Sequence, residues 1–506
     1  MSTSKVTRTT QLDKTNILEE IEAILGSDFI KSITVPAENI PIIRYNRQKT
    51  QSLLMGVKEY GYRLDGIFAS DLIQEIEINY ILSNPEYIAF SDIILQVQIE
   101  KNLEQPSISN IFPNAQLLEE NITHRMGVEF HRFDNSAEEE GLKICYPVIL
   151  GRNKLNKEVT KIGILDDVHE KNGCISICTN RRNDKIDKIE LTTGWYYSRT
   201  QPKLESLGNV LDASILFQNQ YKNEAFSLNL AYILNLEKSL GITITNKVNH
   251  IRTLLAELDR IRSHLIWFET LAILLKHTPF ARKIQNFVKK IERENQSAFN
   301  HSSLFDTILL GSVADISQTK AKNYFDFMEK VSVSISRTLG TFSRLNNIKE
   351  NLTGIGNISK QKAYEAGLSG PALRASGNFV DTRKSQTYLS YLSGNIAQKW
   401  SLSGGINGDC YTRTMVRLSE IFESMKIASE LLKGLSNYVL PTAKPVSIKD
   451  NQEFEHFTYT KVESPQGELG VIFKTEKEKK SKTLHTIRIL TPDLRNFTSL
   501  SSILIG

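Results

Sequence analysis

The sequence predicts an α+β protein in which an N-terminal α/β domain precedes a β-rich segment and a mainly helical bundle. Strand-like runs with alternating polar and apolar residues fill the region 29–133. From 201 to 440 apolar residues recur every three or four positions, the spacing of helices that pack on a core. The strand pattern returns at 455–492, where we expect a β-hairpin.

Length and composition narrow the class of protein. The 506 residues correspond to about three domains. Hydrophobic residues make up 40% and charged residues 24%, which is too apolar for a disordered chain. The net charge of +5 is too small, and its signs too evenly mixed, for a protein whose main partner is nucleic acid.

Membrane-spanning and secretory segments are not expected. The longest apolar stretch, 265–275, contains Glu269 and is shorter than the roughly 20 apolar residues that cross a bilayer. The N-terminal sequence MSTSKVTRTTQLDK lacks the apolar core of a secretory signal, which favours a cytoplasmic location.

The elements of the first part follow from local patterns. Residues 1–28 are expected to be a mobile N-terminus with one short amphipathic run, LEEIEAIL. Within 29–133, ITVPAENIPIIRY, YILSNPEYIAFSD and DIILQVQIE predict strands, and the alternation at 94–99 predicts a sheet with one face toward solvent. The acidic segment DNSAEEEG at 134–141 has the composition of a linker.

The second part, 142–506, is expected to be one large domain. Its start, 142–200, is β-rich, with ICYPVIL, GCISICT and KIELTTGWYY separated by turn residues. A stripe from Val248 to Phe268 predicts a long helix, and a second helix is expected over about 412–435. A lysine-rich, solvated turn is expected within the final strands.

The cysteines do not predict a metal site. Cys174 and Cys178 form a C-x3-C pair without a second pair at ligand spacing. Cys145 and Cys410 are isolated and are expected to behave as small buried apolar residues. His264, in LDRIRSHLIWF, is either a proton relay or a packing histidine that holds a carboxylate.

Two glycine-punctuated segments, GLSGPALRASGNFVDTR at 367–383 and GGINGDCYTRTMVR at 404–417, combine turn glycines with arginine and aspartate. Neither has the spacing of a phosphate-binding loop or a dinucleotide-binding turn. Two interpretations remain open, an internal network of bidentate arginine–carboxylate bonds and a cofactor-lining role. The candidate network consists of Arg374, Asp381, Arg383, Asp409, Arg413, Arg417, Glu463 and Glu468.

The order of five segments resembles the large, quinone-site subunit of proton-pumping NADH:quinone oxidoreductase (complex I) and of the related membrane-bound energy-converting NiFe hydrogenases. These segments are RTLLAELDRIRSHLIWF, GLSGPALRASGNFVDTR, GDCYTRTMVRLSEIFESMKI, ESPQGELGVIF and IRILTPDLRNF. The stretch 105–133 is similar to the end of the family's small α/β accessory subunit. The resemblance therefore implies a fusion of both subunits and a helical bundle of the NiFe-hydrogenase large-subunit type.

Several positions depart from the family pattern. The two C-x2-C pairs that hold nickel and iron in the hydrogenases are missing, so the resemblance implies no NiFe site. The quinone histidine corresponds to Asp166, with His169 as a substitute only in another register. The quinone tyrosine corresponds to Lys222, beside Tyr221, and an aspartate of the family corresponds to Leu274.

One turn of the family's site is partly retained. The His-Arg-Gly-x-Glu-Lys turn corresponds to SRTQPKL, which keeps Arg199 and Lys203. In the family this arginine lies against the terminal 4Fe-4S cluster of the neighbouring small subunit. The candidates for a position near quinone or cluster are Arg199, Lys203, Tyr221, His169 and His264.

The resemblance implies a peripheral-arm subunit on the cytoplasmic side of the inner membrane, with a small 4Fe-4S subunit and antiporter-like membrane subunits as partners. No cofactor is expected to bind directly, although quinone is a candidate acceptor, and no independent enzymatic activity is expected. The alternative is a catalytically inactive structural or coupling scaffold. A free-standing enzyme is disfavoured because no nucleophile, phosphate cradle or acid–base pair emerges.

Overall fold

The computed structural model describes most of the chain between residues 30 and 503. Its descriptions omit 35–39, 73, 86–90, 102, 132–142, 146–159, 164–175, 183–184, 193–199, 208–209, 221–223, 387, 439–441, 443, 449–451, 476–480, 499 and 501–502. The chain divides into two compact units. The first comprises 1–138 with 365–367, and the second comprises 139–364 with 368–506. The expected mobile N-terminus, 1–28, and the linker at 134–141 lie outside the described residues.

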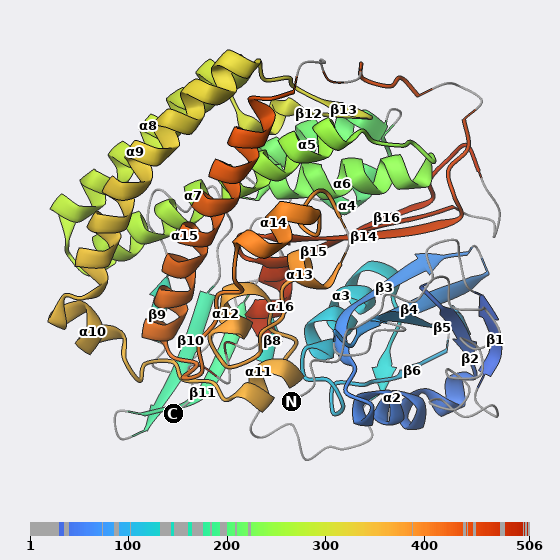
Figure 1. The fold of residues 1–506 in the computed structure, drawn as a ribbon. Coiled ribbons are helices and arrows are strands. Elements are labelled where there is room, and N and C mark those ends of the chain that lie inside the picture. Colours follow the sequence, from blue (N-terminus) through green and yellow to red (C-terminus); the bar gives the residue numbers. More distant parts are fainter. Residues whose placement is uncertain are drawn as a thin grey trace, which may run out of the picture. The chain divides into compact units, whose positions relative to one another are not determined.

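The first unit is built on a five-stranded sheet with strand order β1-β2-β5-β4-β3 (Figure 1). Only β2 and β5 pair in parallel, and the other neighbours are antiparallel. The five strands are β1 (Ile30–Thr34), β2 (Ile42–Tyr45), β3 (Arg63–Asp71), β4 (Glu75–Ser83) and β5 (Asp92–Glu100). The remaining elements are α2 (Thr50–Glu59), α3 (Ala115–Met126) and the short parallel pair β6 (Gln105–Pro106) and β7 (Phe130–His131).

The expectation of a solvent-facing side at 94–99 is wrong for most of strand β5. Gln96 is buried because it donates to Asn79 Oδ1 at 2.9 Å and accepts from Arg44 Nε at 2.6 Å. Ile94 is also buried, and Gln98 is the member of the polar set that is exposed. Hydrogen bonds between side chains thus allow polar residues to face the interior of this unit.

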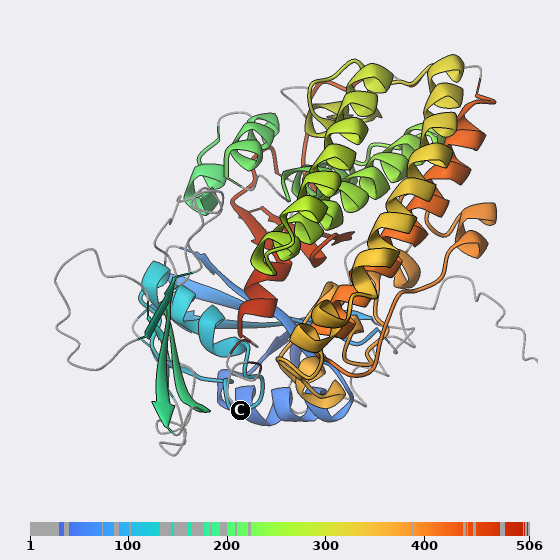
Figure 2. The same cartoon turned by 90° about the vertical axis from the view of Figure 1, so that its left-hand side faces the viewer.

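Long helices dominate the second unit, which agrees with the predicted α+β class. The helices from residue 200 onward are α4 (Thr200–Glu205), α5 (Ala213–Gln220), α6 (Ala225–Ser239), α7 (Asn246–Leu274), α8 (Thr278–Phe299), α9 (Gln318–Ser343), α10 (Asn346–Leu352), α11 (Lys360–Glu365), α12 (Gly370–Arg374), α13 (Thr382–Ser385), α14 (Gly394–Lys399), α15 (Cys410–Leu435) and α16 (Pro492–Thr498). Helix α7 packs against α8 and α15, and α15 packs against α9, as both views show (Figures 1 and 2).

The apolar stripe predicted for 248–268 explains this packing. Val248, Ile251, Leu255 and Leu258 are fully buried at helical spacing. Helix α15 begins where Asp409 accepts a hydrogen bond from the backbone N–H of Thr412, which satisfies one of the free donors of the first turn. Both predicted long helices are therefore confirmed.

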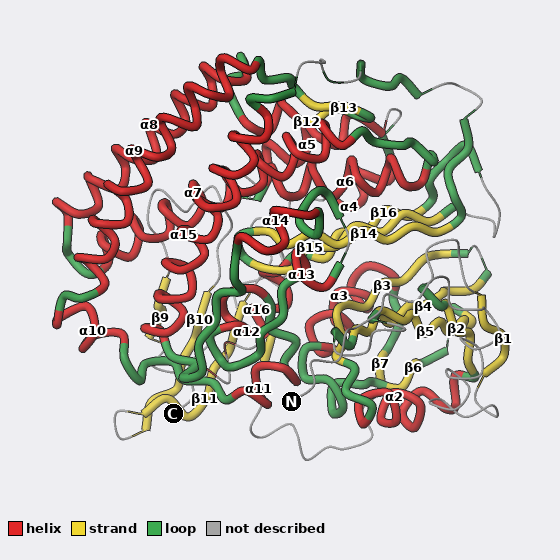
Figure 3. Tube along the Cα trace, viewed as in Figure 1, coloured by secondary structure: helices red, strands yellow, loops and turns green. Residues whose placement is uncertain are grey.

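Two larger sheets complete the second unit (Figure 3). The β-rich stretch predicted at 142–200 contains a sheet of order β8-β11-β10-β9, with strands β8 (Lys143–Cys145), β9 (Thr160–Gly163), β10 (Ser176–Arg182) and β11 (Lys185–Thr192). A short antiparallel pair is formed by β12 (Ile308–Leu309) and β13 (Ser312–Val313).

The C-terminal strands form a three-stranded antiparallel sheet, not the single hairpin expected at 455–492. Its strands are β14 (Phe457–Ser464), β15 (Gly467–Lys474) and β16 (Thr486–Leu490). The turn between β14 and β15 is tight, and the lysine-rich segment joins β15 to β16. Helix α6 packs on this sheet, where the rings of Tyr232 and Phe473 make an edge contact at 5.0 Å.

In the part of the chain that the structure describes, no helix combines the length and the apolar character that crossing a membrane requires.

Gly408 occupies a turn that a side chain would disrupt. Its φ is +66°, and an added Cβ would clash with the Ile358 carbonyl oxygen. The glycine donates its N–H to Ala375 O at 2.9 Å and accepts from Ile358 N at 3.1 Å, so the turn cannot shift without losing both bonds. We expect Gly408→Ala to lower the free energy of unfolding by about 2 kcal/mol or more, which thermal denaturation will show as a lower Tm.

Gly340, inside helix α9, is the matched control. An added Cβ there has no neighbour within 4 Å, so Gly340→Ala should raise stability by about 0.5–1 kcal/mol through its better helix propensity. Equal Tm changes in the two variants would contradict this account of Gly408.

Candidate functional site

The two central helices carry charged residues on faces that point into the protein. On α7, Glu257, Arg260 and His264 recur at spacings of three and four, so they share a face. On α15, Glu420 and Ser424 lie one turn apart. None of these five side chains is more than 1% exposed. Because an unpaired buried charge is strongly destabilising, each charged group needs a partner.

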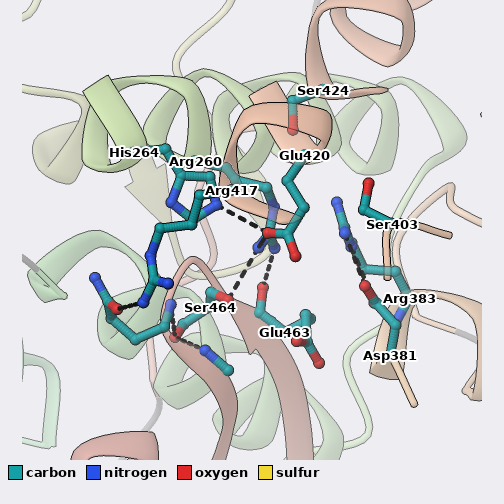
Figure 4. A network of polar contacts seen from close by, with 12 residues as sticks. Arg260, His264, Asp381, Arg383, Ser403, Arg417, Glu420, Ser424, Glu463 and Ser464 are labelled. Atoms are coloured by element: carbon teal, nitrogen blue, oxygen red, sulfur yellow. Dashed lines mark hydrogen bonds and ion pairs between the residues drawn. The ribbon is translucent and has the colours of Figure 1, made fainter. Parts of the chain in front are cut away.

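Arg374, at the end of α12, supplies the partner for Glu420. Its Nε and Nη2 donate to Glu420 Oε1 at 3.1 and 2.7 Å. Its Nη1 donates to Glu463 Oε1 at 2.7 Å and to the Val380 carbonyl oxygen at 2.9 Å. His264 Nε2 lies 2.8 Å from the other oxygen of Glu420 (Figure 4). One guanidinium group therefore joins α12 to α15 and β14.

Arg383, on α13, joins a second set of groups. Its Nε and Nη2 donate to the two oxygens of Asp381 at 3.0 and 2.8 Å (Figure 4). Its Nη1 lies 3.2 Å from both oxygens of Glu257. Glu257 also accepts from the hydroxyls of Tyr391 at 2.6 Å and Ser424 at 2.5 Å. The carboxylate on α7 thus has donors from three other segments.

Arg260 connects α7 to β14 through the backbone. Its Nη1 donates to the Ser464 carbonyl oxygen at 3.0 Å, and its Nη2 donates to the Glu463 carbonyl oxygen at 2.5 Å (Figure 4). The Glu463 carboxylate accepts from the backbone N–H of Thr382 at 3.0 Å. These bonds fix the end of β14 against α7 and α13.

We call this set the buried arginine–carboxylate network. Its ionisable members, apart from His264, are Arg260, Arg374, Arg383, Glu257, Asp381, Glu420 and Glu463. Three guanidinium groups therefore face four carboxyl groups, which leaves one negative charge in excess if all are ionised.

The pKa values of these buried groups reflect the excess of carboxyl groups over guanidinium groups. Burial alone would raise the pKa of Glu420, but Arg374 and His264 hold it well below its ordinary value. Glu463 shows the opposite shift, because burial and the neighbouring Asp381 raise its pKa. Burial lowers the pKa of His264 to about 4, against the opposing effect of Glu420. The imidazole is thus neutral at pH 7.

The network acts structurally, because its charged side chains bond to one another and hold neighbouring segments together. The side chains are 6% exposed or less, and the guanidinium groups donate to several acceptors each. The sequence left two interpretations of the 367–383 segment open, an internal arginine–carboxylate network and a cofactor-lining role. These contacts are those of an internal network that holds the segment in place. Arg374, Asp381, Arg383 and Glu463 are brought together, as the candidate list anticipated, and His264 holds a carboxylate.

The other members of the candidate list lie in separate contacts. Asp409 caps α15 and also accepts from the Gly354 N–H at 2.8 Å. Arg413 donates to the carbonyl oxygens of Gly356 at 2.9 Å and Gly408 at 2.6 Å. Arg417 lies over the Trp267 ring, 4.6 Å from its centroid. Asp409 and Arg413 thus order the loop that precedes α15.

Glu468 belongs to a different ion-pair group on the C-terminal sheet. Its carboxylate oxygens lie 3.2 Å from Lys461 Nζ and 3.4 Å from Arg495 Nη1. Lys203, on α4, is exposed. The remaining candidates, His169, Arg199 and Tyr221, lie outside the described residues.

Two features were not predicted from the sequence. These are the buried acidic residues of the helices and a second arginine–carboxylate pair, between α6 and α7. Glu237 on α6 and Arg252 on α7 form a bidentate pair at 2.7 and 2.6 Å. Glu237 also accepts from the Gly311 N–H at 2.7 Å, and Arg252 donates to the Leu309 and Ser312 carbonyl oxygens at 2.8 and 2.9 Å. The available signal was a charged residue inside an otherwise apolar helical stripe, as at Glu257, because such a residue must have a buried partner.

Among the described residues, no three histidine, cysteine, aspartate or glutamate side chains converge as a possible metal site. Of the positions that the family resemblance assigns to quinone, Leu274 is the one that the structure describes. Its apolar side chain is 70% exposed near the end of α7, so it does not fit the role of a buried acid. We therefore derive no reaction step through quinone.

Asp259, on α7, differs from the carboxylates of the network. Its side chain is 4% exposed, and its Oδ2 atom has no hydrogen-bond partner among the described residues. Burial raises its pKa to about 6, although the nearby Arg262 and Arg260 act in the opposite direction. Glu224 is a second buried carboxyl group near Asp259, and burial raises its pKa well above the ordinary value.

We expect the network to lose much of its stabilising effect in Glu420→Gln. This change removes the charge opposite Arg374 and weakens the bond to His264, so the free energy of unfolding should fall by about 3 kcal/mol or more. Glu430→Gln on the same helix is the control, because that side chain is only half-buried, and should change stability by less than about 0.5 kcal/mol. Thermal denaturation of both variants checks this, and similar Tm values would refute it.

Asp259 should make the stability depend on pH between about 3 and 7. Its folded-state pKa lies above its ordinary value of 3.8, so the ionised form destabilises the folded protein above pH 6 and protonation relieves this on acidification. The wild type should gain up to about 3 kcal/mol relative to Asp259→Asn as the pH falls through this range. Denaturation at several pH values measures the difference, and parallel curves for the two proteins would contradict the assignment.

Comparison with known proteins shows what the chain is similar to. Residues 306–457 match the family described as respiratory-chain NADH dehydrogenase, 49 Kd subunit. The NADH-quinone oxidoreductase subunits D of Burkholderia multivorans and Burkholderia cenocepacia are 26% identical over 325 residues, and that of Burkholderia vietnamiensis is 25% identical. Each alignment covers 54% of this chain and 76% of the relative. The chain is thus similar to the large, quinone-site subunit of complex I over about half of its length.

Proposed function

We propose that this chain is a peripheral-arm subunit of a membrane-bound, complex-I-like oxidoreductase. There it helps to form an electron-transfer site beside a small 4Fe-4S subunit and couples that site to ion-translocating membrane subunits. The observation that carries the proposal is the similarity to NADH-quinone oxidoreductase subunits D, which extends along three quarters of those proteins. In this proposal the accessory part, 29–133, and the large part, 142–506, act as one subunit on the cytoplasmic side of the membrane.

The buried arginine–carboxylate network supports such a role. A subunit that forms the wall of an electron-transfer site contributes fixed shape and fixed charge, because the redox groups are held by its partner. Arg374 and Arg383 hold α12 and α13 against α7, α15 and β14 through charge-assisted hydrogen bonds. These segments therefore form one rigid surface from distant parts of the chain.

Arg199 is the residue that we propose to influence the partner's cluster. In the family resemblance its position lies against the terminal 4Fe-4S cluster. A nearby guanidinium group stabilises the reduced, more negative state of a cluster and so raises its reduction potential. Lys203, four residues further on, is the second retained cation of that turn.

The alternative is a non-catalytic scaffold that anchors or couples the membrane subunits. Two observations favour it. Leu274 replaces a family aspartate with an exposed apolar side chain, and the network around Glu420 has its acceptors already occupied. In the scaffold Tyr221 and His169 have no quinone-related role.

Purification in mild detergent separates the two functions. The tagged chain is isolated from native membranes, iron and nickel are measured by mass spectrometry, and clusters are detected by electron paramagnetic resonance. A small-subunit partner with an iron–sulfur signal and without nickel supports the electron-transfer role. Membrane partners without iron support the scaffold, and a protein that purifies alone contradicts both.

The Arg199→Ala variant of the purified complex tests the electron-transfer role directly. Loss of the guanidinium charge should lower the reduction potential of the partner's cluster, and Arg199→Lys should restore most of it. Lys203→Ala is the comparison variant. Lys203 is the second cation retained from the family's turn, and its exposed side chain on α4 should have a smaller effect on the reduction potential. A redox titration followed by electron paramagnetic resonance measures this, and an unchanged potential in Arg199→Ala leaves only the scaffold.

A further inference from the structure

A cavity of about 530 Å³ lies between α7, α8 and the segment that follows α8. Its volume is in the range of sites that hold small molecules. Asp259 and Arg262 contribute from α7, Lys289 and Arg293 from α8, and His301 from the following segment. None of these side chains belongs to the buried arginine–carboxylate network, so the cavity is a separate polar region of the second unit.

Two buried polar atoms on the wall of the cavity have no hydrogen-bond partner among the described residues. One is Asp259 Oδ2, an acceptor, and the other is Asn295 Nδ2, a donor. The side chains are 4% and 5% exposed, so they form the deep part of the wall. The Tyr324 hydroxyl donates to Asn295 Oδ1, which orients the amide and leaves its NH₂ group available. An unsatisfied buried polar group destabilises the protein, and a ligand with matching polar groups would remove that cost.

The outer part of the wall is basic. Lys289 and Arg293 are exposed, and Arg262 forms an ion pair with Glu292 at 2.9 Å. Three cationic side chains therefore line the cavity together with two carboxylates, those of Asp259 and Glu292. A divalent cation fits this surrounding poorly, because hard cations need several oxygen ligands and are repelled by nearby positive charge. An anionic ligand fits the basic outer part, provided that it carries a hydrogen-bond donor for Asp259.

We propose that this cavity binds a small hydroxylated organic anion. Its carboxylate or phosphate group contacts Lys289 and Arg293, its hydroxyl donates to Asp259 Oδ2, and one of its oxygens accepts from Asn295 Nδ2. The proposal rests on the cavity and its unpartnered atoms, and it does not depend on the electron-transfer role.

Matched pairs of anions that differ by one hydroxyl test the proposal. L-malate is compared with succinate, and citrate with tricarballylate, by isothermal titration calorimetry on the full chain at pH 7.5. The hydroxylated member should bind about tenfold more tightly, because a hydrogen bond to a charged group is worth about 1.5 kcal/mol or more. In Asp259→Asn this preference should fall to less than about threefold, while the affinity for succinate is unchanged or higher because a repelling charge is lost.

The basic side chains require a second comparison. Lys289→Ala and Arg293→Ala should weaken the binding of both members of each pair, whereas Lys290→Ala, an exposed lysine of α8 outside the cavity, should not. Glu294→Gln, on α8, is the control for Asp259→Asn, because the Glu294 side chain does not line the cavity. The proposal is overturned if neither hydroxylated anion binds with a dissociation constant below about 10 mM, or if the hydroxyl preference survives in Asp259→Asn. Binding that is lost equally in Lys290→Ala would identify general charge attraction and would also overturn it.

Discussion

The structure of the second unit depends on the burial of ionised groups inside a helical core. Glu257, Arg260 and Glu420 point inward from α7 and α15, where the loss of hydration must be offset by direct bonds. The offsetting groups come from distant parts of the chain. Arg383 is 126 residues from Glu257, and the Ser464 carbonyl oxygen is 204 residues from Arg260. Because removing one partner leaves an uncompensated buried charge, these bonds fix the positions of α12, α13 and β14 against the two helices.

The same constraint leaves the buried arginine–carboxylate network little capacity to bind other groups. The buried network has few free donors or acceptors, since Arg374 alone bonds Glu420, Glu463 and the Val380 carbonyl oxygen. In the proposed electron-transfer role, such a rigid arrangement fixes distances and fields for a neighbouring cluster. The neutral His264 belongs to the same arrangement, because burial outweighs the attraction of Glu420 in setting its protonation.

One helix presents two polar environments of opposite character. Glu257 and Asp259 are two positions apart on α7, so their side chains leave the helix in directions about 200° apart. The carboxylate of Glu257 has donors from Arg383, Tyr391 and Ser424, and its pKa is lowered despite burial. Asp259 faces the cavity with an oxygen that has no hydrogen-bond partner among the described residues, and its pKa is raised by burial. Two buried carboxylates of one helix thus differ in their surroundings, because only that of Glu257 is surrounded by donors.

The sequence by itself determined the main helices and the family resemblance. The apolar spacing from Val248 to Phe268 predicted α7, the glycine-punctuated 367–383 segment indicated an arginine–carboxylate network, and the order of five segments indicated the relatives. Only the tertiary structure decided which charges meet. It paired Arg374 with Glu420 and left Asp409 to cap a helix, and it buried Gln96 where alternation predicted solvent. The physical reason is that periodicity reflects local backbone hydrogen bonding, whereas the partner of a buried charge is set by packing between segments far apart in the chain.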